Sequence, residues 1–123
     1  MIISHKYKFI FIKTTKTAGA SIEVDLNKIL GKDYVATPIF PPVDGHTAKN
    51  YRYDPCSNEF FYNHISASKV RSVIGEKLFH DYFSFCVERD PINKCISHYS
   101  MAKNSNHFNK KERNKNLTFE KYI

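Results

Sequence analysis

FIFIKTTKTAGAS, residues Phe9 to Ser21, joins an apolar run to a polar loop and then to the start of a helical pattern. Tyr7–Ile12 is rich in aromatic and β-branched residues, which is typical of a strand buried on both faces, as in a parallel sheet. From Gly19 to Gly31 the apolar residues recur at helical spacing, at Ile22, Leu26, Ile29 and Leu30. The sequence therefore predicts a strand, a tight loop with two lysines, and a helix in immediate succession.

A second apolar run, Tyr82–Val87, leads into another predicted helix. The run predicts a buried strand, and the segment Glu88-Arg89-Asp90-Pro91 ends it. Asp90 is a favourable N-cap residue, and Pro91 suits the first helical position. Apolar residues then recur at i, i+3, i+4 and i+7, namely Ile92, Cys95, Ile96 and Tyr99. The chain thus contains two predicted strand-to-helix units.

The first strand-to-helix junction has groups that bind anions. Unpaired backbone N–H groups meet the positive end of the helix dipole there, and Lys16 adds a full charge. Thr17 and Ser21 add hydroxyl donors, and Gly19 lets the backbone approach an oxyanion closely. The Walker pattern GxxxxGK[ST] is absent, because the loop has one glycine and its lysine comes earlier. The alternative is an ordinary turn with solvated lysines.

The second junction adds two more candidate anion ligands. Arg89 stands where the carboxyl end of a strand opens into a ligand crevice in α/β sheets, and a guanidinium can fork onto a phosphate. Ser97 follows about two helical turns later and off the apolar face, so its hydroxyl can turn toward the same anion. The alternative for Arg89 is a salt bridge to Glu88 or Asp90.

Together the two junctions resemble motifs of the sulfotransferases that use 3′-phosphoadenosine 5′-phosphosulfate, and most closely those of the carbohydrate-type branch. Phe9–Ser21 resembles the family's 5′-phosphosulfate loop. Residues 83–91 with Ile96-Ser97-His98-Tyr99 are similar to its 3′-phosphate motif, a strand ending in Arg-Asp-Pro and a helix carrying Ser-His-Tyr. Two positions depart from the family pattern: Thr15 stands where proline is common, and Ala20 where threonine or serine is common.

The resemblance implies a fold and a set of ligand contacts. The fold would be a P-loop NTPase-like α/β sandwich of three layers around a central, mostly parallel sheet, truncated or minimal in this chain. No metal would be needed, and adenosine 3′,5′-bisphosphate would be the nucleotide product. The 5′-phosphosulfate would be bound by Lys16, Thr17, Gly19, Ala20 (through its backbone) and Ser21, and the 3′-phosphate by Arg89 and Ser97.

A histidine between the two motifs is the predicted catalytic base. Phe61–Ala67 is similar to the family segment that precedes the middle helix and can supply that base, which makes His64 the candidate and His46 the second choice. Lys16 would steady the bridging oxygen of the leaving nucleotide, while His64 would remove the proton of the attacking hydroxyl. The alternative is that His64 only bonds local backbone at the start of a helix.

The other segments predict one domain over residues 1–123. Tyr34–Ala36 has the pattern of a short strand. Residues 37–60 form a Pro-rich, irregular connection, long enough to be a substrate-facing loop. A helix is expected from about Ser66, with Gly75 as a break or stop.

Composition limits the possible partners. The chain of 123 residues has a formal net charge of +7, which favours an anionic partner. The tail, 103–123, alternates lysine and asparagine and is expected to be solvated. No run approaches the ~20 apolar residues of a membrane span and no signal-peptide pattern is present, so we expect a soluble, cytoplasmic protein. Three cysteines without metal-type spacing predict reduced thiols rather than a disulfide framework or a zinc site.

Three other functions stay open beside sulfuryl transfer to a hydroxyl acceptor, for which a carbohydrate is the first choice. A P-loop, kinase-like protein would bind ATP at the same junction, although the Walker glycines and a metal-holding aspartate after a strand are missing. A nucleic-acid-binding module would use the tail and stacking aromatics such as Tyr51, Tyr53 and Phe61, but no recognised motif supports it. A truncated, non-catalytic remnant would bind the nucleotide without turnover.

Overall fold

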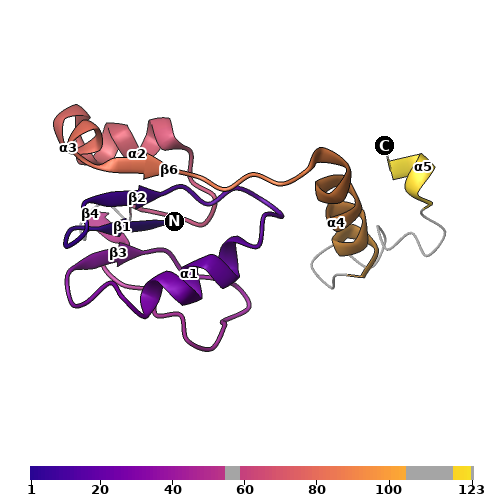
Figure 1. The fold of residues 1–123 in the computed structure, drawn as a ribbon, viewed down its shortest axis with the longest axis horizontal. Coiled ribbons are helices and arrows are strands. Elements are labelled where there is room, and N and C mark those ends of the chain that lie inside the picture. Colours follow the sequence, from indigo (N-terminus) through magenta and orange to yellow (C-terminus); the bar gives the residue numbers. More distant parts are fainter. Residues whose placement is uncertain (55–58, 105–117, 123) are drawn as a thin grey trace. The chain divides into compact units, whose positions relative to one another are not determined.

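The computed structural model describes residues 1–54, 59–104 and 118–122 (Figure 1). The chain groups into two compact units, Met1–Val87 and Glu88–Ile123, and the single domain expected over residues 1–123 stays a prediction. The first unit contains β1 (Ile2–Ser4), β2 (Phe9–Phe11), α1 (Gly19–Asn27), β3 (Tyr34–Ala36), β4 (Arg52–Asp54), β5 (Glu59–Phe60), α2 (Ala67–Ile74), α3 (Glu76–Asp81) and β6 (Phe83–Phe85). The second contains α4 (Pro91–Asn104) and α5 (Phe119–Tyr122).

The central sheet has the strand order β3-β1-β2-β6 and is mixed. β1 pairs antiparallel with β2 and with β3, whereas β2 and β6 are parallel. The expectation of a mostly parallel sheet is therefore wrong for the described strands. Only residues 5–8 separate β1 from β2, and a connection that short allows only antiparallel pairing. The P-loop NTPase-like sandwich itself stays a prediction.

Both faces of the sheet are covered by other elements. Side chains alternate along each strand, so register-paired residues share a face. Ile2 of β1 packs on the α1 side with Ile22 and Leu26, whereas Ile3 packs on the opposite side with Val70 of α2. Because Ile2 and Ile3 point to opposite faces of β1, α1 and α2 cover opposite faces of the sheet. The first unit is thus a small mixed α/β structure with a covered sheet.

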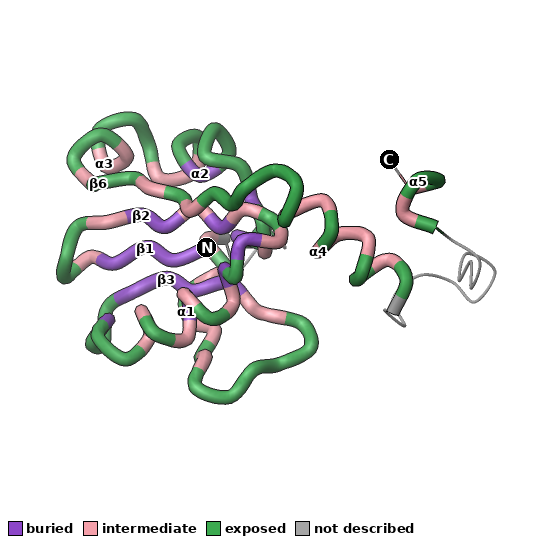
Figure 2. The backbone as a smooth tube through the Cα atoms, turned by 45° about the vertical axis from the view of Figure 1, so that its right-hand side comes forward, coloured by how far each residue is buried: buried purple, intermediate pink, exposed green. Residues whose placement is uncertain are grey.

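β6 corrects the expectation of a second buried strand. The strand forms within the predicted range, but it lies at the sheet edge, where β2 is its one described neighbour. Phe83 is 72% exposed, and Figure 2 shows β1, β2 and β3 as the buried strands. An apolar, aromatic run has the same composition at an edge as in the centre, because neighbours rather than propensity decide burial.

The segments between the two motifs follow the predicted pattern in part. β3 coincides with the strand expected at Tyr34–Ala36. Within the connection expected to be irregular, 37–60, the hairpin β4–β5 forms, and residues 55–58 lie outside the described residues. α2 begins after Ser66, whose Oγ accepts from the backbone N–H of Lys69 (3.3 Å). Gly75 has φ 88°, a conformation that favours glycine, and separates α2 from α3, as predicted.

The second unit consists of α4 and the short α5. Asp90 caps α4, because its Oδ1 accepts from the backbone N–H of Asn93 (3.0 Å), which confirms the predicted cap. Residues 105–117 and 123 of the expected tail lie outside the described part of the chain. Its described end contacts α4, since the Tyr99 ring packs against the rings of Phe119 and Tyr122. None of the helices in the described ranges has the length and apolarity to cross a membrane.

Candidate functional site

The loop from β2 to α1 has an unusual backbone. Lys16 and Ala18 both adopt left-handed conformations, with φ 60° and 59°. Left-handed residues occur in the loops whose backbone N–H groups bind anions. Ala18 at the N-cap offers no side-chain acceptor to α1, and the first turn of α1 has no acidic residue. The start of α1 therefore keeps its positive end available to a ligand.

A buried ion pair supports this loop from below. Lys13 Nζ lies 2.8 Å from Glu23 Oε2, with the two side chains 5% and 0% exposed. The stem of Lys13 passes against Gly19, where an added Cβ would stand 2.6 Å from Lys13 Cγ. Gly19 is thus required by packing, in addition to the ligand approach that stays a prediction. Sequence reasoning missed this pair, and its one signal was a charged residue on each side of the loop next to apolar neighbours.

Further groups converge on Glu23. The amino group of Met1 donates to Glu23 and to Thr37 Oγ1 (2.9 Å), and burial lowers its pKa. The side chain of His46 is 4% exposed, its Nε2 lies 4.0 Å from Glu23 Oε2, and that nitrogen has no hydrogen-bond partner among the described residues. Burial lowers the pKa of His46. The second-choice base is therefore enclosed in the protein beside Glu23.

The residues of the loop that are predicted to bind the phosphosulfate differ in their solvent exposure and in their existing hydrogen bonds. Thr17 is 4% exposed, and its hydroxyl bonds to Thr14 Oγ1 (2.9 Å) and Thr14 O (3.2 Å). Lys16 is half-buried and forms no ion pair among the described residues, while Ala20 is half-buried and Ser21 is exposed. Lys16, Ala20 and Ser21 are thus the accessible part of this set, whereas Gly19 is buried against Lys13 and the hydroxyl of Thr17 is engaged inside the loop.

His64 is attached to the same loop from a distant part of the chain. Its Nδ1 lies 3.1 Å from the carbonyl oxygen of Lys13, 51 positions away, so the alternative of a bond to local backbone is wrong. Because a carbonyl only accepts, Nδ1 carries the proton and Nε2 is left as an acceptor. Burial lowers the pKa of His64, which keeps the ring neutral at pH 7. A neutral ring with an available Nε2 is what a general base requires.

The second junction is exposed and held by local bonds. Glu88 pairs with Lys94 (2.7 Å), and this hydrogen bond is the main reason why the pKa of Glu88 is lowered. Asp90 is the cap of α4. Arg89 therefore makes neither of the salt bridges considered as its alternative, and its side chain forms no ion pair among the described residues. Ser97 is half-buried on α4, in the same unit as Arg89.

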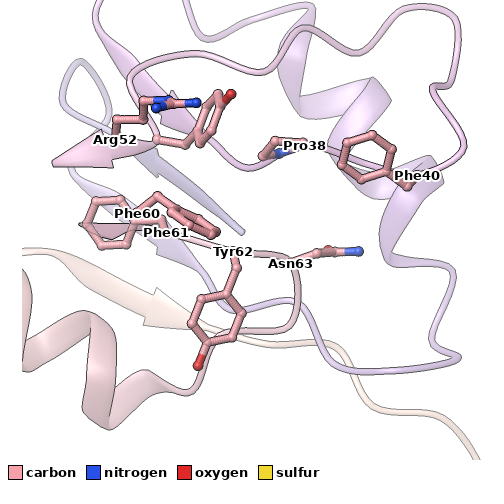
Figure 3. A pocket seen from close by; sticks show the side chains of 8 residues that line it. Pro38, Phe40, Arg52, Phe60, Phe61, Tyr62 and Asn63 are labelled. Atoms are coloured by element: carbon pink, nitrogen blue, oxygen red, sulfur yellow. The ribbon is translucent and has the colours of Figure 1, made fainter. Parts of the chain in front are cut away.

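A cavity of about 410 Å³ lies at the β4–β5 hairpin (Figure 3). Asn63, the neighbour of His64 in the chain, lines it. The cavity uses part of the 37–60 connection, which gives the predicted substrate-facing segment a concave surface. Its lining residues are Pro38, Phe40, Tyr51, Arg52, Phe60, Phe61, Tyr62 and Asn63.

Metal ligands and known relatives give no further assignment. Across the described ranges, no three His, Cys, Asp or Glu side chains gather in a way that could hold a metal ion. The absence of a metal from the reaction stays a prediction. Comparisons with protein-family models, with curated proteins and with solved structures find no match to this chain.

Proposed function

We propose that the chain is a sulfotransferase that moves a sulfuryl group from 3′-phosphoadenosine 5′-phosphosulfate to a hydroxyl acceptor. One observation carries the proposal: the two strands that lead into the motifs, β2 and β6, are parallel neighbours. Ile12 N donates to Phe85 O (2.8 Å), and Thr14 Oγ1 donates to Val87 O (2.6 Å). Carboxyl ends of parallel neighbours meet at one sheet edge, where α/β proteins bind ligands. Sequence order alone does not require this adjacency.

The groups at the first junction fit the phosphosulfate end of the nucleotide. The open N-terminus of α1, the left-handed turn at Lys16 and Ala18, and the lysine charge all favour an anion. Glu23 is the nearest carboxylate of α1, but Lys13 and the Met1 amino group neutralise it. Lys16 binds the bridging oxygen, where negative charge develops during transfer. By the resemblance to the sulfotransferases, Arg89 and Ser97, which both belong to the second unit, would supply a guanidinium and a hydroxyl for the 3′-phosphate.

His64 performs the proton transfer. Its Nδ1–H bond to Lys13 O fixes the tautomer and leaves Nε2 to accept the proton of the acceptor hydroxyl. The bound nucleotide supplies the sulfuryl group. Transfer forms a bond from the acceptor oxygen to sulfur and breaks the bond from sulfur to the bridging oxygen of the 5′-phosphate. The acceptor proton goes to His64, and the negative charge that develops on the bridging oxygen lies beside Lys16. Positioning and charge stabilisation do most of the work in such transfers.

Calorimetric titration tests the nucleotide part of the proposal. Adenosine 3′,5′-bisphosphate should bind more tightly than AMP or ATP, with the same affinity with and without magnesium. Lys16→Ala should weaken the binding of all three nucleotides, because it removes the charge at the shared 5′ end. Lys28→Ala is the matched control, because that lysine is 68% exposed and pairs with Asp25. Equal affinity for AMP, or an absolute magnesium requirement with ATP, would favour the kinase-like alternative.

A further inference from the structure

The cavity at the hairpin has aromatic walls. Five of its eight lining residues are Phe or Tyr. Phe61 is 3% exposed and is a fixed part of this lining. Its N–H donates to Tyr51 O (2.7 Å), and the centre of its ring lies 4.8 Å from that of the Tyr53 ring. A volume of about 410 Å³ is in the range of small-molecule sites. The cavity therefore has room for a compound with a single ring, which would pack against the fixed Phe61 side chain.

Three of the aromatic residues that line the cavity are exposed. Phe40, Phe60 and Tyr62 are 77%, 45% and 47% exposed, and all three line the same cavity. Single exposed apolar residues are common, but aromatic rings gathered around one hollow mark a binding surface. Such rings offer their faces to a flat, apolar ligand.

One charged residue lines this cavity. Arg52 of β4 is the cross-strand partner of Phe60 in β5, and its guanidinium lies 6.0 Å from the centre of the Tyr51 ring. It forms no ion pair with any residue that the structure describes. A guanidinium near an aromatic face, without an ion pair among the described residues, is suited to bind a carboxylate. The ligand should therefore carry an acidic group.

We propose that this cavity binds the acceptor substrate and that the acceptor is a hydroxylated aromatic acid. The ring packs among the aromatic walls, the acidic group pairs with Arg52, and the hydroxyl extends toward Asn63, the neighbour of His64. Figure 3 shows Arg52 above Phe60 and Phe61, and Asn63 between Tyr62 and Phe40. A free sugar fits less well, because it needs several polar partners, and apart from two tyrosines only Arg52 and Asn63 provide polar side chains. This inference rests on the proposed sulfuryl transfer.

Calorimetry without nucleotide tests the ligand class with three probes: 4-hydroxybenzoate, its neutral analogue 4-hydroxybenzyl alcohol, and methyl β-glucopyranoside. We expect 4-hydroxybenzoate to bind about tenfold or more tightly than the alcohol, as a charge-assisted contact predicts, and the glucoside not to bind. Arg52→Gln should abolish the difference between acid and alcohol. Arg71→Gln removes the same charge from α2, outside this cavity, and should leave the difference unchanged. Phe60→Ala should weaken both aromatic probes alike.

Each result decides one claim. Equal binding of acid and alcohol, tighter binding of the glucoside, or an Arg52→Gln variant that keeps the preference would overturn the proposed acceptor class. If 4-hydroxybenzoate binds as expected but adenosine 3′,5′-bisphosphate does not, the cavity is a ligand site and the sulfotransferase proposal fails. If both bind, mass spectrometry of 4-hydroxybenzoate incubated with protein and sulfate donor should detect the sulfate ester. Its absence would refute the acceptor role.

Discussion

The two strand-to-helix junctions have the same sequence pattern, an apolar strand followed by a polar loop and a helix, but different contacts hold them. The junction from β2 to α1 rests on long-range buried contacts: Lys13 with Glu23, and the Lys13 carbonyl with His64. From Glu88 onward, the junction from β6 to α4 is held by bonds between residues at most six apart, such as Glu88 with Lys94, and its long-range bond is the one from Thr14 to Val87 O. A ligand of the first junction meets groups already in place, whereas a ligand of the second must order an exposed Arg89 at an entropic cost.

The largest effect should come from breaking the buried support of the first junction. Glu23→Ala leaves the ammonium of Lys13 and the amino group of Met1 buried without their carboxylate. The free energy of unfolding should fall by about 3–5 kcal/mol, measured by urea denaturation. Asp25→Ala is the control on the same helix, because the exposed pair with Lys28 is worth less than about 1 kcal/mol. Similar losses in both variants would contradict the contrast between the junctions.

The next effect concerns the histidine held by the first junction. His64→Ala should keep nucleotide affinity within a few-fold and lower the rate of sulfuryl transfer by roughly 10²–10⁴, the usual worth of a positioned base. His80→Ala is the control, since that ring is exposed and bonds to Glu76 (3.1 Å). Normal transfer by the His64 variant would leave this residue with a structural role only.

The pH profile sharpens the same assignment. A base acts when it is deprotonated, and burial lowers the pKa of His64 below its ordinary value of about 6.5. The kcat/KM for the acceptor should therefore stay constant as the pH falls through 6.5 and decline only at lower pH. A decline that begins above pH 6.5 would show that another group is the base.

The same contrast explains what the sequence could predict. Local patterns suffice for the strand, loop and helix of Phe9–Ser21 and for the strand at Tyr34–Ala36, because apolar periodicity and turn residues act within a few positions. They did not predict β1, which has three residues, or the exposure of Phe83. Both depend on which strand lies alongside, and strand pairing is decided by tertiary contacts.

The candidate site could be predicted in part. The places of Lys16 and Arg89 at the two strand-to-helix junctions follow from the sequence pattern, and their roles as ligands stay predictions. The pairing of Lys13 with Glu23 and the bond from His64 to the loop were not predictable, because each requires the packed structure. His64 was proposed from a resemblance, and the sequence alone did not say what it bonds.

A smaller effect is expected at the exposed junction. Arg89→Ala should reduce the preference for adenosine 3′,5′-bisphosphate over AMP by about 1.5–3 kcal/mol, the range for a hydrogen bond to a charged group, measured by calorimetry. Lys94→Ala should act in the same direction but less strongly, because Glu88 loses its partner at 2.7 Å and becomes available to compete for Arg89. If Arg89→Ala lowers the affinities for both nucleotides equally, Arg89 does not bind the 3′-phosphate.

The smallest effect separates the junctions by pH. His46, beside Glu23, Lys13 and the Met1 amino group, has a lowered pKa in the folded state, so the unfolded chain binds its proton more readily. Stability from this group is complete above about pH 6.5 and is lost as the pH falls toward the folded pKa. Glu88 also has a lowered pKa, but as a carboxylate it loses its contribution to stability only below its ordinary pKa of 4.5.

Between pH 6.5 and 5, acid should therefore weaken the contacts of the first junction and leave those of the second unchanged. Urea denaturation across this range should show the free energy of unfolding falling with pH, and His46→Gln should make that fall shallower. Met1 and His64 are present in both proteins, so we assign the difference between the two slopes to the loss of the His46 imidazole; identical slopes would mean that His46 is not enclosed beside Glu23 in solution.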